Sequence, residues 1–342
     1  MSGHRAGQES APLRIGVLGC ADIALRRMLP AFAASPHTVL AAIASRTAGR
    51  ARAATEAFGG APVEGYETLL ERPDVDAVYI PLPVALHAPW TARALRAGKH
   101  VLAEKPLTEH PVATARLLDL ARERGLVLAE NYLFPHHRAY TAVRQLVASG
   151  AIGVPRALHA SFTIPPRPAD DIRYRADLAG GALLDVGVYP LRLASLLLGP
   201  GLGVRGAVLR HDPVRGVDLG GAALLGGPDD GVSAQLVFGM EHPYTADWRL
   251  IGSEGALFLD RAYTPPRDHR PVLRIERAGG VEERVLPAYD QVAAAVAAFA
   301  GAVLRATGRG ARPRTDPAHA ADILRQAELV EAVRRAARVT PS

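Results

Sequence analysis

The chain has very few of the residues that build disulfide frameworks or base-stacking surfaces. Its 342 residues include one cysteine, Cys20, and aromatic residues make up only 5% of the chain. A single cysteine excludes an internal disulfide framework and fits a reducing compartment. The few aromatics never alternate with basic clusters, which argues against a surface for stacking nucleic-acid bases. We therefore expect no nucleic-acid partner.

Long apolar runs and concentrated charge are missing as well. No uninterrupted apolar stretch approaches the ~18 residues that a membrane span requires. The first twelve residues, MSGHRAGQESAP, lack the apolar core of a signal peptide. We expect residues 1–12 to be a disordered tail and the protein to be cytoplasmic, without a membrane partner. The net charge of +6 comes from scattered arginines, and a phosphate-rich small ligand accounts for it as well as nucleic acid would.

The composition is that of a folded protein with a core, and the length favours two domains. Hydrophobic residues make up 49% of the chain and charged residues 22%. Over residues 13–131, short apolar runs such as RIGVLG, VLAAIAS and HVLAEK alternate with helical patterns that often end at glycine. This alternation predicts an α/β domain, a doubly wound parallel sheet of the Rossmann type covered on both faces.

The pattern changes after about residue 132. Eight strand-like segments between residues 158 and 286 are separated by turns, and one helical stretch near 183–198 interrupts them. Two helices, at about 289–306 and 317–338, close the chain. This order predicts a second domain over residues 132–342, an α+β unit with a large and mostly antiparallel sheet.

A short loop at the end of the first strand has the position of a dinucleotide-binding fingerprint. It reads Gly19-Cys20-Ala21-Asp22-Ile23-Ala24, a G-x-A-x-x-A pattern where G-x-G-x-x-G is usual. The first glycine makes the tight turn, and the pyrophosphate lies at the start of the following helix. Because a strand precedes the loop and a helix follows it, we expect these six residues to bind a dinucleotide. The alternative is a plain tight turn.

The end of the second strand distinguishes two cofactors. NAD sites usually have an acidic residue there, whereas this chain has Ser45-Arg46-Thr47. A carboxylate would repel a 2′-phosphate, and a guanidinium offers several donors to it. Ser45 and Arg46 therefore predict NADPH. The alternative is that Arg46 is merely a solvated residue at the start of the next helix.

Two more strand ends carry residues to the same edge of the sheet. Leu82 and His87 lie at and just beyond the end of the strand-like run VDAVYIPL, and Glu104-Lys105-Pro106 ends the run that begins HVLAEK. Since ligands bind at the carboxyl ends of the strands in such sheets, we expect Leu82, His87, Glu104 and Lys105 near the cofactor.

The stretch GGALLDVGVYP, residues 180–190, places an acid and a phenol at the start of an otherwise apolar helix. Asp185 and Tyr189 are four residues apart and share one helix face. Pro190 removes a helical hydrogen bond to Val186, so we expect an irregular turn. The two glycines at 180–181 would let the segment approach the cofactor closely. The alternative is that Asp185 satisfies nearby backbone amides and Tyr189 is an ordinary core phenol.

Together, the GCADIA loop, PLPVALH, AEKPL and GGALLDVGVYP resemble the Gfo/Idh/MocA oxidoreductases, over nearly the whole chain. The resemblance implies a Rossmann domain followed by an α/β domain whose open sheet usually mediates homodimers or homotetramers. It also implies that Lys105 and Tyr189 flank the reacting carbon, with Asp185 as the motif's acid. Polyol dehydrogenases of the family typically have His and Asp where this chain has Tyr189 and Arg192, which argues against polyol oxidation.

More narrowly, the segments GVLGCADIA, FGGAPVEGY, SFTIPP, DIRY and FGMEH are similar to the NDP-sugar 3-ketoreductases of deoxysugar biosynthesis. That similarity implies an enzyme that uses NADPH to reduce the 3-keto group of a dTDP-linked 3,4-diketo-2,6-dideoxyhexose. Two other functions stay open: an NADP-dependent dehydrogenase of free sugars or trans-dihydrodiols, and a non-catalytic NADP-binding sensor.

Ketone reduction requires a hydride, which nicotinamide supplies, and a proton, which the protein must provide. We expect Tyr189 to donate the proton while Lys105 acts as a cationic partner and hydrogen-bonds the developing alkoxide. The reverse, with Lys105 donating and Tyr189 orienting, stays open. Asp185 would bind a sugar hydroxyl or orient Lys105.

Two interpretations are open for each of several other residues. Arg173, with Tyr174 beside it, would bind the substrate diphosphate, unless it forms a salt bridge to Asp170 or Asp171. Tyr66 matches a family position near the cofactor, or packs against the loop as a helix-start residue. Arg26 and Arg27 would reach phosphate or face solvent, and the sequence does not choose.

We expect no metal site. His136-His137 is the only histidine pair, and no cysteine or acid accompanies it at ligand spacing. The pair is expected at the surface, in a loop or at the start of a helix.

Overall fold

Six parallel strands form the sheet of the first lobe in the computed structural model, which describes residues 11–229, 231–306 and 315–341. The strands are β1 (Leu13–Leu18), β2 (Thr38–Ser45), β3 (Ala61–Glu64), β4 (Ala77–Ile80), β5 (His100–Glu104) and β6 (Leu128–Asn131). Their order is β3-β2-β1-β4-β5-β6, so the direction of winding reverses between β1 and β4. Ligands bind at that reversal in such sheets. The predicted doubly wound domain is confirmed; the short, proline-containing β3 was not anticipated.

The tail expected over residues 1–12 lies outside the described residues, except for residues 11 and 12.

Two buried clusters cover the two faces of this sheet. Helices α3 (Tyr66–Leu70), α4 (Val84–Arg96) and α5 (Pro111–Arg124) cover one face, where Leu18, Val78 and Val101 are buried. Helices α1 (Leu29–Ala34) and α2 (Ala48–Phe58) lie toward the other face, where Ile15, Val17 and Tyr79 are buried. The strands alternate between two apolar faces, as expected for a parallel sheet buried on both sides.

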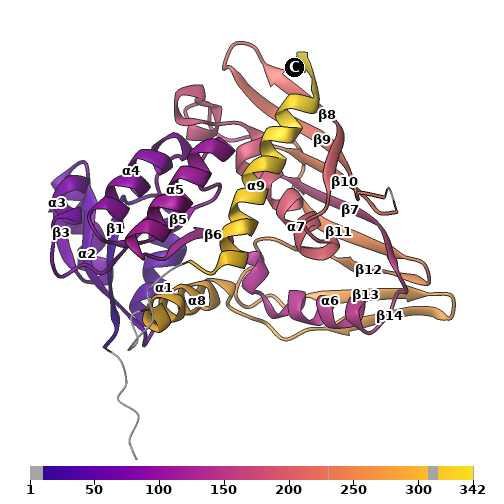
Figure 1. Ribbon diagram of the computed structural model, residues 1–342, viewed down its shortest axis with the longest axis horizontal. Helices are drawn as coiled ribbons and strands as arrows, with labels where there is room; N and C mark the ends of the chain where they lie inside the picture. Colours follow the sequence, from indigo (N-terminus) through magenta and orange to yellow (C-terminus); the bar gives the residue numbers. More distant parts are fainter. Residues whose placement is uncertain (1–10, 230, 307–314, 342) are drawn as a thin grey trace, which may run out of the picture.

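A nine-stranded sheet forms the second lobe (Figure 1). Its strands are β7 (Pro155–Thr163), β8 (Gly203–Asp212), β9 (Val217–Gly226), β10 (Ser233–Gly239), β11 (Thr245–Gly252), β12 (Gly255–Leu259), β13 (Val272–Arg277), β14 (Gly280–Val285) and β15 (Ala337–Pro341). The order is β14-β13-β12-β11-β7-β10-β9-β8-β15, antiparallel except for the pairs β7–β10 and β8–β15. Helices α6 (Arg138–Ala148) and α7 (Val188–Leu198) belong to this lobe. The predicted mostly antiparallel sheet is confirmed, and β15 is the strand that the sequence did not reveal.

Helix α8 (Gln291–Ala306) comes late in the chain but completes the first lobe. Val296, Phe299 and Val303 are buried in one cluster with Ile15 of β1 and Met28. Figure 1 shows α8 beside α1, away from the second sheet. The proposed division at residue 132 therefore describes the two sheets but not this helix.

Helix α9 (Pro317–Ala336) runs along the junction of the two lobes (Figure 1). Ile323 packs into the core of the first lobe, whereas Leu329, Val330 and Val333 pack into that of the second. One helix, α9, therefore contributes side chains to the cores of both lobes.

One described segment, Ala176–Leu198, is long and apolar enough to cross a membrane by length and composition. Of its most apolar 18-residue window 61% is buried, and Leu183, Leu191 and Leu193 lie in the core of the second lobe. We interpret it as a core helix.

Candidate active site

A cavity of about 680 Å³ lies where the carboxyl ends of the parallel strands meet the second lobe. This volume is typical of a small-molecule site. Most of the predicted site residues line it: Gly19, Cys20, Ala21, Asp22, Ile23, Ser45, Arg46, Tyr66, Leu82, Glu104, Lys105, Arg173, Asp185 and Tyr189. Ala24, His87 and Tyr174 do not. The residues that the edge-of-sheet argument selected therefore mostly surround one cavity.

The first loop needs only one glycine for its turn. Gly19 has φ +119°, and a Cβ there would lie 3.0 Å from Leu82 Cδ2. Ala21 and Ala24 are not among the residues with positive φ. Ala24 is fully buried at the start of η1, a π-helix over Ala24–Met28, so its role is packing. The G-x-A-x-x-A pattern thus keeps the backbone conformation of the fingerprint, because only its first position requires glycine.

Two arginines, Arg46 and Arg50, line the cavity just after the end of β2. Arg46 is exposed at the cavity, and it forms no ion pair with an acid in the described ranges. Arg50, one turn later on α2, also lines the cavity, and its Nη2 donates to the backbone oxygen of Cys20 at 3.1 Å. The acidic lining residues, Asp22, Glu104 and Asp185, belong to other segments. This donor set fits a 2′-phosphate, and the i, i+4 spacing of the two arginines was a sequence signal for Arg50 that we missed.

Tyr66 and His87 have different placements. Tyr66 lines the cavity and packs edge-on against Trp90, with ring centroids 5.0 Å apart. His87 is 1% exposed and lies behind the cavity wall. Its Nδ1 is 2.8 Å from the Pro106 oxygen and its Nε2 is 2.6 Å from the Leu82 oxygen, while burial lowers its pKa. His87 therefore links the loops that follow β4 and β5. It was expected near the cofactor, but it does not line the cavity.

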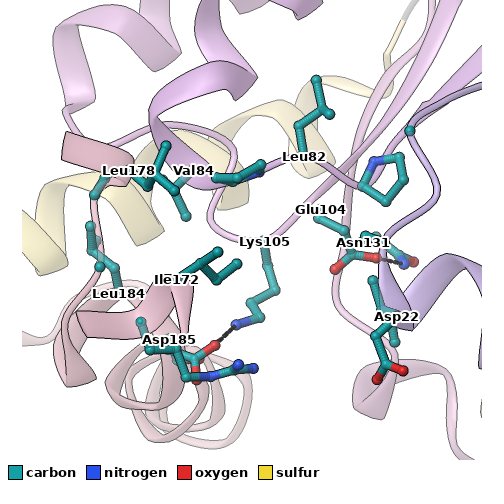
Figure 2. Close-up of a pocket in the computed structure, with 18 of the residues that line it drawn as sticks. Asp22, Leu82, Val84, Glu104, Lys105, Asn131, Ile172, Leu178, Leu184 and Asp185 are labelled. Carbon is teal, nitrogen blue, oxygen red and sulfur yellow. Dashed lines mark hydrogen bonds and ion pairs between the residues drawn. The ribbon is translucent and has the colours of Figure 1, made fainter. Parts of the chain in front are cut away.

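Lys105 is held by Asp185 at the centre of the cavity (Figure 2). Its Nζ donates to the Asp185 backbone oxygen at 2.6 Å and to Oδ1 at 3.1 Å. Asp185 Oδ2 accepts from Arg173 Nε at 2.5 Å. Burial opposes ionisation of Asp185, but the charges of Lys105 and Arg173 outweigh it and hold the pKa of the carboxyl well below its ordinary value. Burial likewise opposes the charge on Lys105, yet Asp185 keeps the pKa of the ammonium raised.

An irregular turn explains why the backbone oxygen of Asp185 is free to bind Lys105. Residues Leu183–Gly187 form a π-helix, η5, which runs directly into α7. Pro190 has no N–H, so it cannot donate to the oxygen of Asp185 in a π-type turn or to that of Val186 in an α-type turn. The expected irregularity is present, and Lys105 donates to the oxygen of Asp185 instead.

The two glycines before this turn serve contacts within the second lobe. A Cβ on Gly180 would lie 2.4 Å from the Arg173 backbone oxygen. A Cβ on Gly181, which has φ +113°, would lie 2.4 Å from Asp218 Oδ1. Asp218 Oδ2 accepts from Leu183 N at 2.6 Å and so anchors the start of the π-helix. The glycines allow these close contacts with Arg173 and Asp218, and both line the cavity, while their approach to the cofactor stays a prediction.

Tyr189 stands beside the Lys105 ammonium, which lies 5.0 Å from the centre of its ring. The ring packs edge-on against Phe162 at 4.9 Å and lies 5.6 Å from the ring of Tyr263. Burial raises the pKa of the phenol, and the charge of Lys105 opposes that rise. No group in the described part of the chain hydrogen-bonds the hydroxyl, which leaves it available to a ligand in the cavity.

Glu104 occupies the wall toward the first loop. Its Oε1 accepts from Tyr79 at 2.6 Å and from Asn131 Nδ2 at 2.7 Å, and burial raises its pKa. Figure 2 shows Glu104 and Asn131 together, across the cavity from Asp185. Asn131 ends β6, so the strand-end argument that selected Glu104 would also have found it.

The second lobe contributes one wall of the cavity, and the sequence predicted few residues of this wall. Phe162, Ile164, Arg167, Tyr244 and Thr264 line it. Tyr174 does not; its oxygen accepts from Arg167 N at 3.2 Å, and its ring packs under Arg215 at 4.4 Å. The expected contact of Tyr174 with substrate is therefore replaced by support of the loop that carries Arg167.

No metal-binding cluster of three or more His, Cys, Asp or Glu side chains occurs among the described residues. The absence of a metal site stays a prediction. His136 and His137 do lie at the start of α6, but His137 is buried, and its Nδ1 accepts from Ala139 N at 3.0 Å. The expectation of a surface pair was wrong for His137, because a capping side chain is buried under its helix.

Family comparisons agree with this geometry. Residues 13–132 match the Gfo/Idh/MocA oxidoreductase family with an NAD-binding Rossmann fold, and residues 140–258 match the Gfo/Idh/MocA C-terminal domain. The chain belongs to the Gfo/Idh/MocA family.

Relatives within the Gfo/Idh/MocA family have narrower descriptions. The chain is 77% identical to a dTDP-3,4-didehydro-2,6-dideoxy-α-D-glucose 3-reductase from Streptomyces violaceoruber, over 95% of each chain. It is 56% identical to the Actinomadura kijaniata enzyme of the same description, over 96% of each. A crystal structure of a 3-ketoreductase from Actinomadura kijaniata, in complex with NADP and TDP-benzene, superposes with a TM-score of 0.93. That structure shares 55% identity and covers 97% of this chain and 100% of its own.

Proposed function

We propose that this protein reduces the C-3 keto group of a dTDP-linked 3,4-diketo-2,6-dideoxyhexose with NADPH, a step of deoxysugar and antibiotic biosynthesis. The observation that carries the proposal is the Lys105–Asp185 pair beside the unbonded Tyr189 hydroxyl, at the edge of a dinucleotide-binding sheet. The 3-ketoreductase relatives, at 77% and 56% identity over nearly the whole chain, supply the substrate class.

The cavity fits NADP(H). Residues 19–23 would hold the pyrophosphate and Arg46, Arg50 and Ser45 the 2′-phosphate end, with Tyr66 and Leu82 beside the first loop. Glu104 and Asn131 form the wall on which the nicotinamide end would rest. When bound, NADPH supplies the hydride.

Tyr189 donates the proton to the ketone oxygen in our preferred mechanism. Tyr189 lines the cavity and its hydroxyl has no partner in the described part of the chain, whereas Asp185 holds two of the three ammonium protons of Lys105. Lys105 stays charged because Asp185 raises its pKa, so the ammonium stabilises both the developing alkoxide and the phenolate that Tyr189 leaves behind.

Asp185 acts as a positioning residue in this mechanism. Both of its carboxylate oxygens bond to cations of the site, Lys105 and Arg173. Arg173 also pairs with Asp171 at 3.1 Å, as one of the two readings of the sequence anticipated. Its Nη2 has no hydrogen-bond partner in the described ranges, so that group stays able to donate to substrate.

Consumption of NADPH tests the proposed function. The assay supplies dTDP-3,4-diketo-2,6-dideoxyhexose generated in place, with the free sugar and a trans-dihydrodiol as parallel substrates. We expect turnover only with the nucleotide-linked ketone. Turnover of the free sugar or diol would favour the dehydrogenase alternative, and tight NADPH binding without any turnover would favour the sensor.

Arg46→Glu is expected to reverse the cofactor preference. A carboxylate in place of the guanidinium repels the 2′-phosphate, and like charges brought together cost several kcal/mol, so KM for NADPH should rise about 10²-fold while KM for NADH changes little. Arg52→Glu is the matched control, because Arg52 is exposed on α2, the helix that follows Arg46, and does not line the cavity. Equal losses in the two variants would contradict the role of Arg46.

Asp185→Asn is expected to change the pH dependence of kcat. Burial lowers the pKa of Lys105 and the Asp185 carboxylate raises it, so the amide should let the ammonium lose its proton at lower pH. The alkaline limb of kcat then moves toward neutral pH, and kcat at high pH falls further below wild type than kcat at pH 6. Parallel profiles for the two proteins would show that Asp185 does not set the charge of Lys105.

We propose that the protein forms a homodimer or homotetramer through the exposed face of its large sheet. Val208, Leu224 and Val237, from adjacent strands β8, β9 and β10, are 44–45% exposed on this face. An apolar patch of this kind is typical of an interface. Light scattering of the purified protein tests it, and a monomer would contradict it. The cytoplasmic location and the absence of nucleic-acid and membrane partners stay predictions.

A further inference from the structure

His87 is a buried titratable side chain that the proposed mechanism does not use. It is 1% exposed and belongs to the first turn of α4. Its two ring nitrogens meet two different segments: Nε2 lies 2.6 Å from the Leu82 oxygen, and Nδ1 lies 2.8 Å from the Pro106 oxygen. One side chain therefore joins the segment after β4 to the segment after β5.

Each of these two segments reaches the active site. Leu82 lines the cavity, and its Cδ2 lies against Gly19 of the first loop, where an added Cβ would be only 3.0 Å away. Pro106 follows Lys105 directly, so its carbonyl group restrains the backbone that carries Lys105. A shift at Leu82 would therefore act on the cofactor end of the site, and a shift at Pro106 would act on the ammonium of Lys105.

The other contacts of the segment after β5 do not replace this restraint. Leu107 N donates to Glu130 Oε1 at 2.7 Å, and the side chain of Lys105 is held from the second lobe. Neither contact involves the carbonyl group of Pro106. His87 therefore holds a part of this backbone that those contacts leave untouched.

The number of protons on the ring decides how many of its contacts are hydrogen bonds, because both oxygens beside it only accept. A neutral imidazole carries one N–H, and its other nitrogen would turn a lone pair toward a carbonyl oxygen. An imidazolium donates from both nitrogens. At 2.6 and 2.8 Å both distances are those of hydrogen bonds. The bridge is therefore complete only when the ring carries both protons.

Burial and charge decide when the second proton binds. Burial lowers the pKa of His87, and the two carbonyl oxygens oppose that effect. The charge of Lys105 lowers the pKa further, whereas the charge of Glu109 raises it. Because the pKa stays below the usual value of a histidine, the ring gains its second proton, and the bridge its second bond, as the pH falls below neutral.

Other charged groups around α4 do not face the ring. The charged residues of α4 and α5 are all exposed to solvent, as is Asp177 of η4 (Ala176–Leu178), which packs against α4. Of the titratable residues of β5, Glu104 lines the cavity and His100 lies at the far end of the strand. The charges of the segment after β5 are therefore those that act on His87.

We propose that His87 is a positioning residue of the reaction: its doubly protonated ring holds the segments of Leu82 and Pro106 in register and so sets the first loop and Lys105 relative to each other. The inference rests on the proposed function, in which Lys105 acts on the ketone. His87 does not line the cavity, so it acts on cofactor and substrate only through these two segments.

Two amide variants separate the two contacts. Asparagine places its amide nitrogen close to the position of Nδ1, and glutamine places its own close to that of Nε2. His87→Asn thus loses the bond to Leu82, so the NADPH Kd, measured by calorimetry, should rise about tenfold while kcat changes less. His87→Gln loses the bond to Pro106, so kcat should fall about tenfold while the NADPH Kd changes less.

The pH dependence is a readout that packing alone would not produce. Each amide offers the same donors at every pH, whereas the wild-type ring gains its second donor as the pH falls. Both losses, taken as ratios to wild type, should therefore be larger at about pH 5.5 than at about pH 8. His87→Phe keeps a ring of similar size without donors and should show both losses together.

His100→Asn is the matched control. His100 is buried in the same lobe and does not line the cavity, so its loss should lower thermal stability at most. Wild-type kcat and NADPH Kd in His87→Phe overturn the inference. Losses in the two amide variants that do not divide between Kd and kcat, or ratios that do not change with pH, overturn it as well. If His87→Phe fails to fold, the comparison of the amide variants decides.

The NADPH Kd separates this inference from the function on which it rests. A wild-type protein that binds NADPH but does not reduce the dTDP-linked ketone overturns the proposed function. The Kd then decides the inference by itself. A rise in His87→Asn but not in His87→Gln, larger at low pH, supports the bridge, and equal Kd values in the two variants overturn it.

Discussion

Tyr189→Phe is expected to lower kcat for ketone reduction by about 10²- to 10⁴-fold, the usual contribution of a general acid. The phenol has no hydrogen-bond partner among the described residues, and phenylalanine keeps the ring packing against Phe162 while removing the proton. Binding of NADPH and dTDP should stay close to wild type, because neither needs the hydroxyl. Stopped-flow measurement of NADPH oxidation separates the chemical step from binding.

Tyr263→Phe is the matched control for this prediction. Tyr263 is fully buried and does not line the cavity, its ring lies 5.6 Å from that of Tyr189, and its hydroxyl has no partner among the described residues. The same loss of one oxygen should therefore leave kcat almost unchanged. Similar kcat values for Tyr189→Phe and wild type would remove Tyr189 from the proton transfer and return that role to Lys105.

Lys105→Met is expected to lower kcat by about 10²- to 10³-fold, as removal of one donor to a developing oxyanion does. Methionine keeps the approximate length of the side chain but carries no charge. It can therefore stabilise neither the alkoxide nor the phenolate at Tyr189. Asp185 would keep Arg173 as a partner, so the site is not left with an uncompensated buried carboxylate. A single-turnover measurement at saturating NADPH gives the loss directly.

Lys105→Arg separates charge from geometry at the same position. It restores a cation, but a planar guanidinium cannot match the ammonium that bonds both the backbone and the carboxylate oxygen of Asp185. We expect partial recovery of kcat relative to Lys105→Met. Full activity in Lys105→Met would contradict an electrostatic role, and a complete loss in Lys105→Met with an active Tyr189→Phe would support proton donation by Lys105.

The fold was predictable because each sheet has its own local pattern. Continuous apolar strands followed by helices fix the parallel sheet, and closely spaced strands with turns fix the antiparallel one. The strands that the sequence did not reveal are β3, which contains Pro62 and has one buried residue, and β15, which is an edge strand directly after a helix. Helix α8 packs on the first lobe, and the apolar pattern that carries Val296 and Phe299 does not itself say which core it joins.

The centre of the site was predictable for a different reason. Lys105, Asp185 and Tyr189 lie at strand and helix ends, where the chemistry of single residues stands out from an apolar background. The sequence could not show that His87 and Tyr174 face away from the cavity, since that depends on their bonds to Pro106, Leu82 and Arg167. Long-range contacts of this kind leave no local pattern.

The late position of α8 also constrains how the chain is made. The face of the first sheet that carries Ile15 and Val17 is covered partly by Val296 and Phe299, which leave the ribosome only after eight of the nine strands of the second sheet. Domains usually fold in order as they emerge, at about 5–20 residues per second. Here the N-terminal lobe must wait with an apolar face uncovered, so its folding during synthesis is tied to completion of the chain, and a fragment ending near residue 132 would expose that face and tend to aggregate.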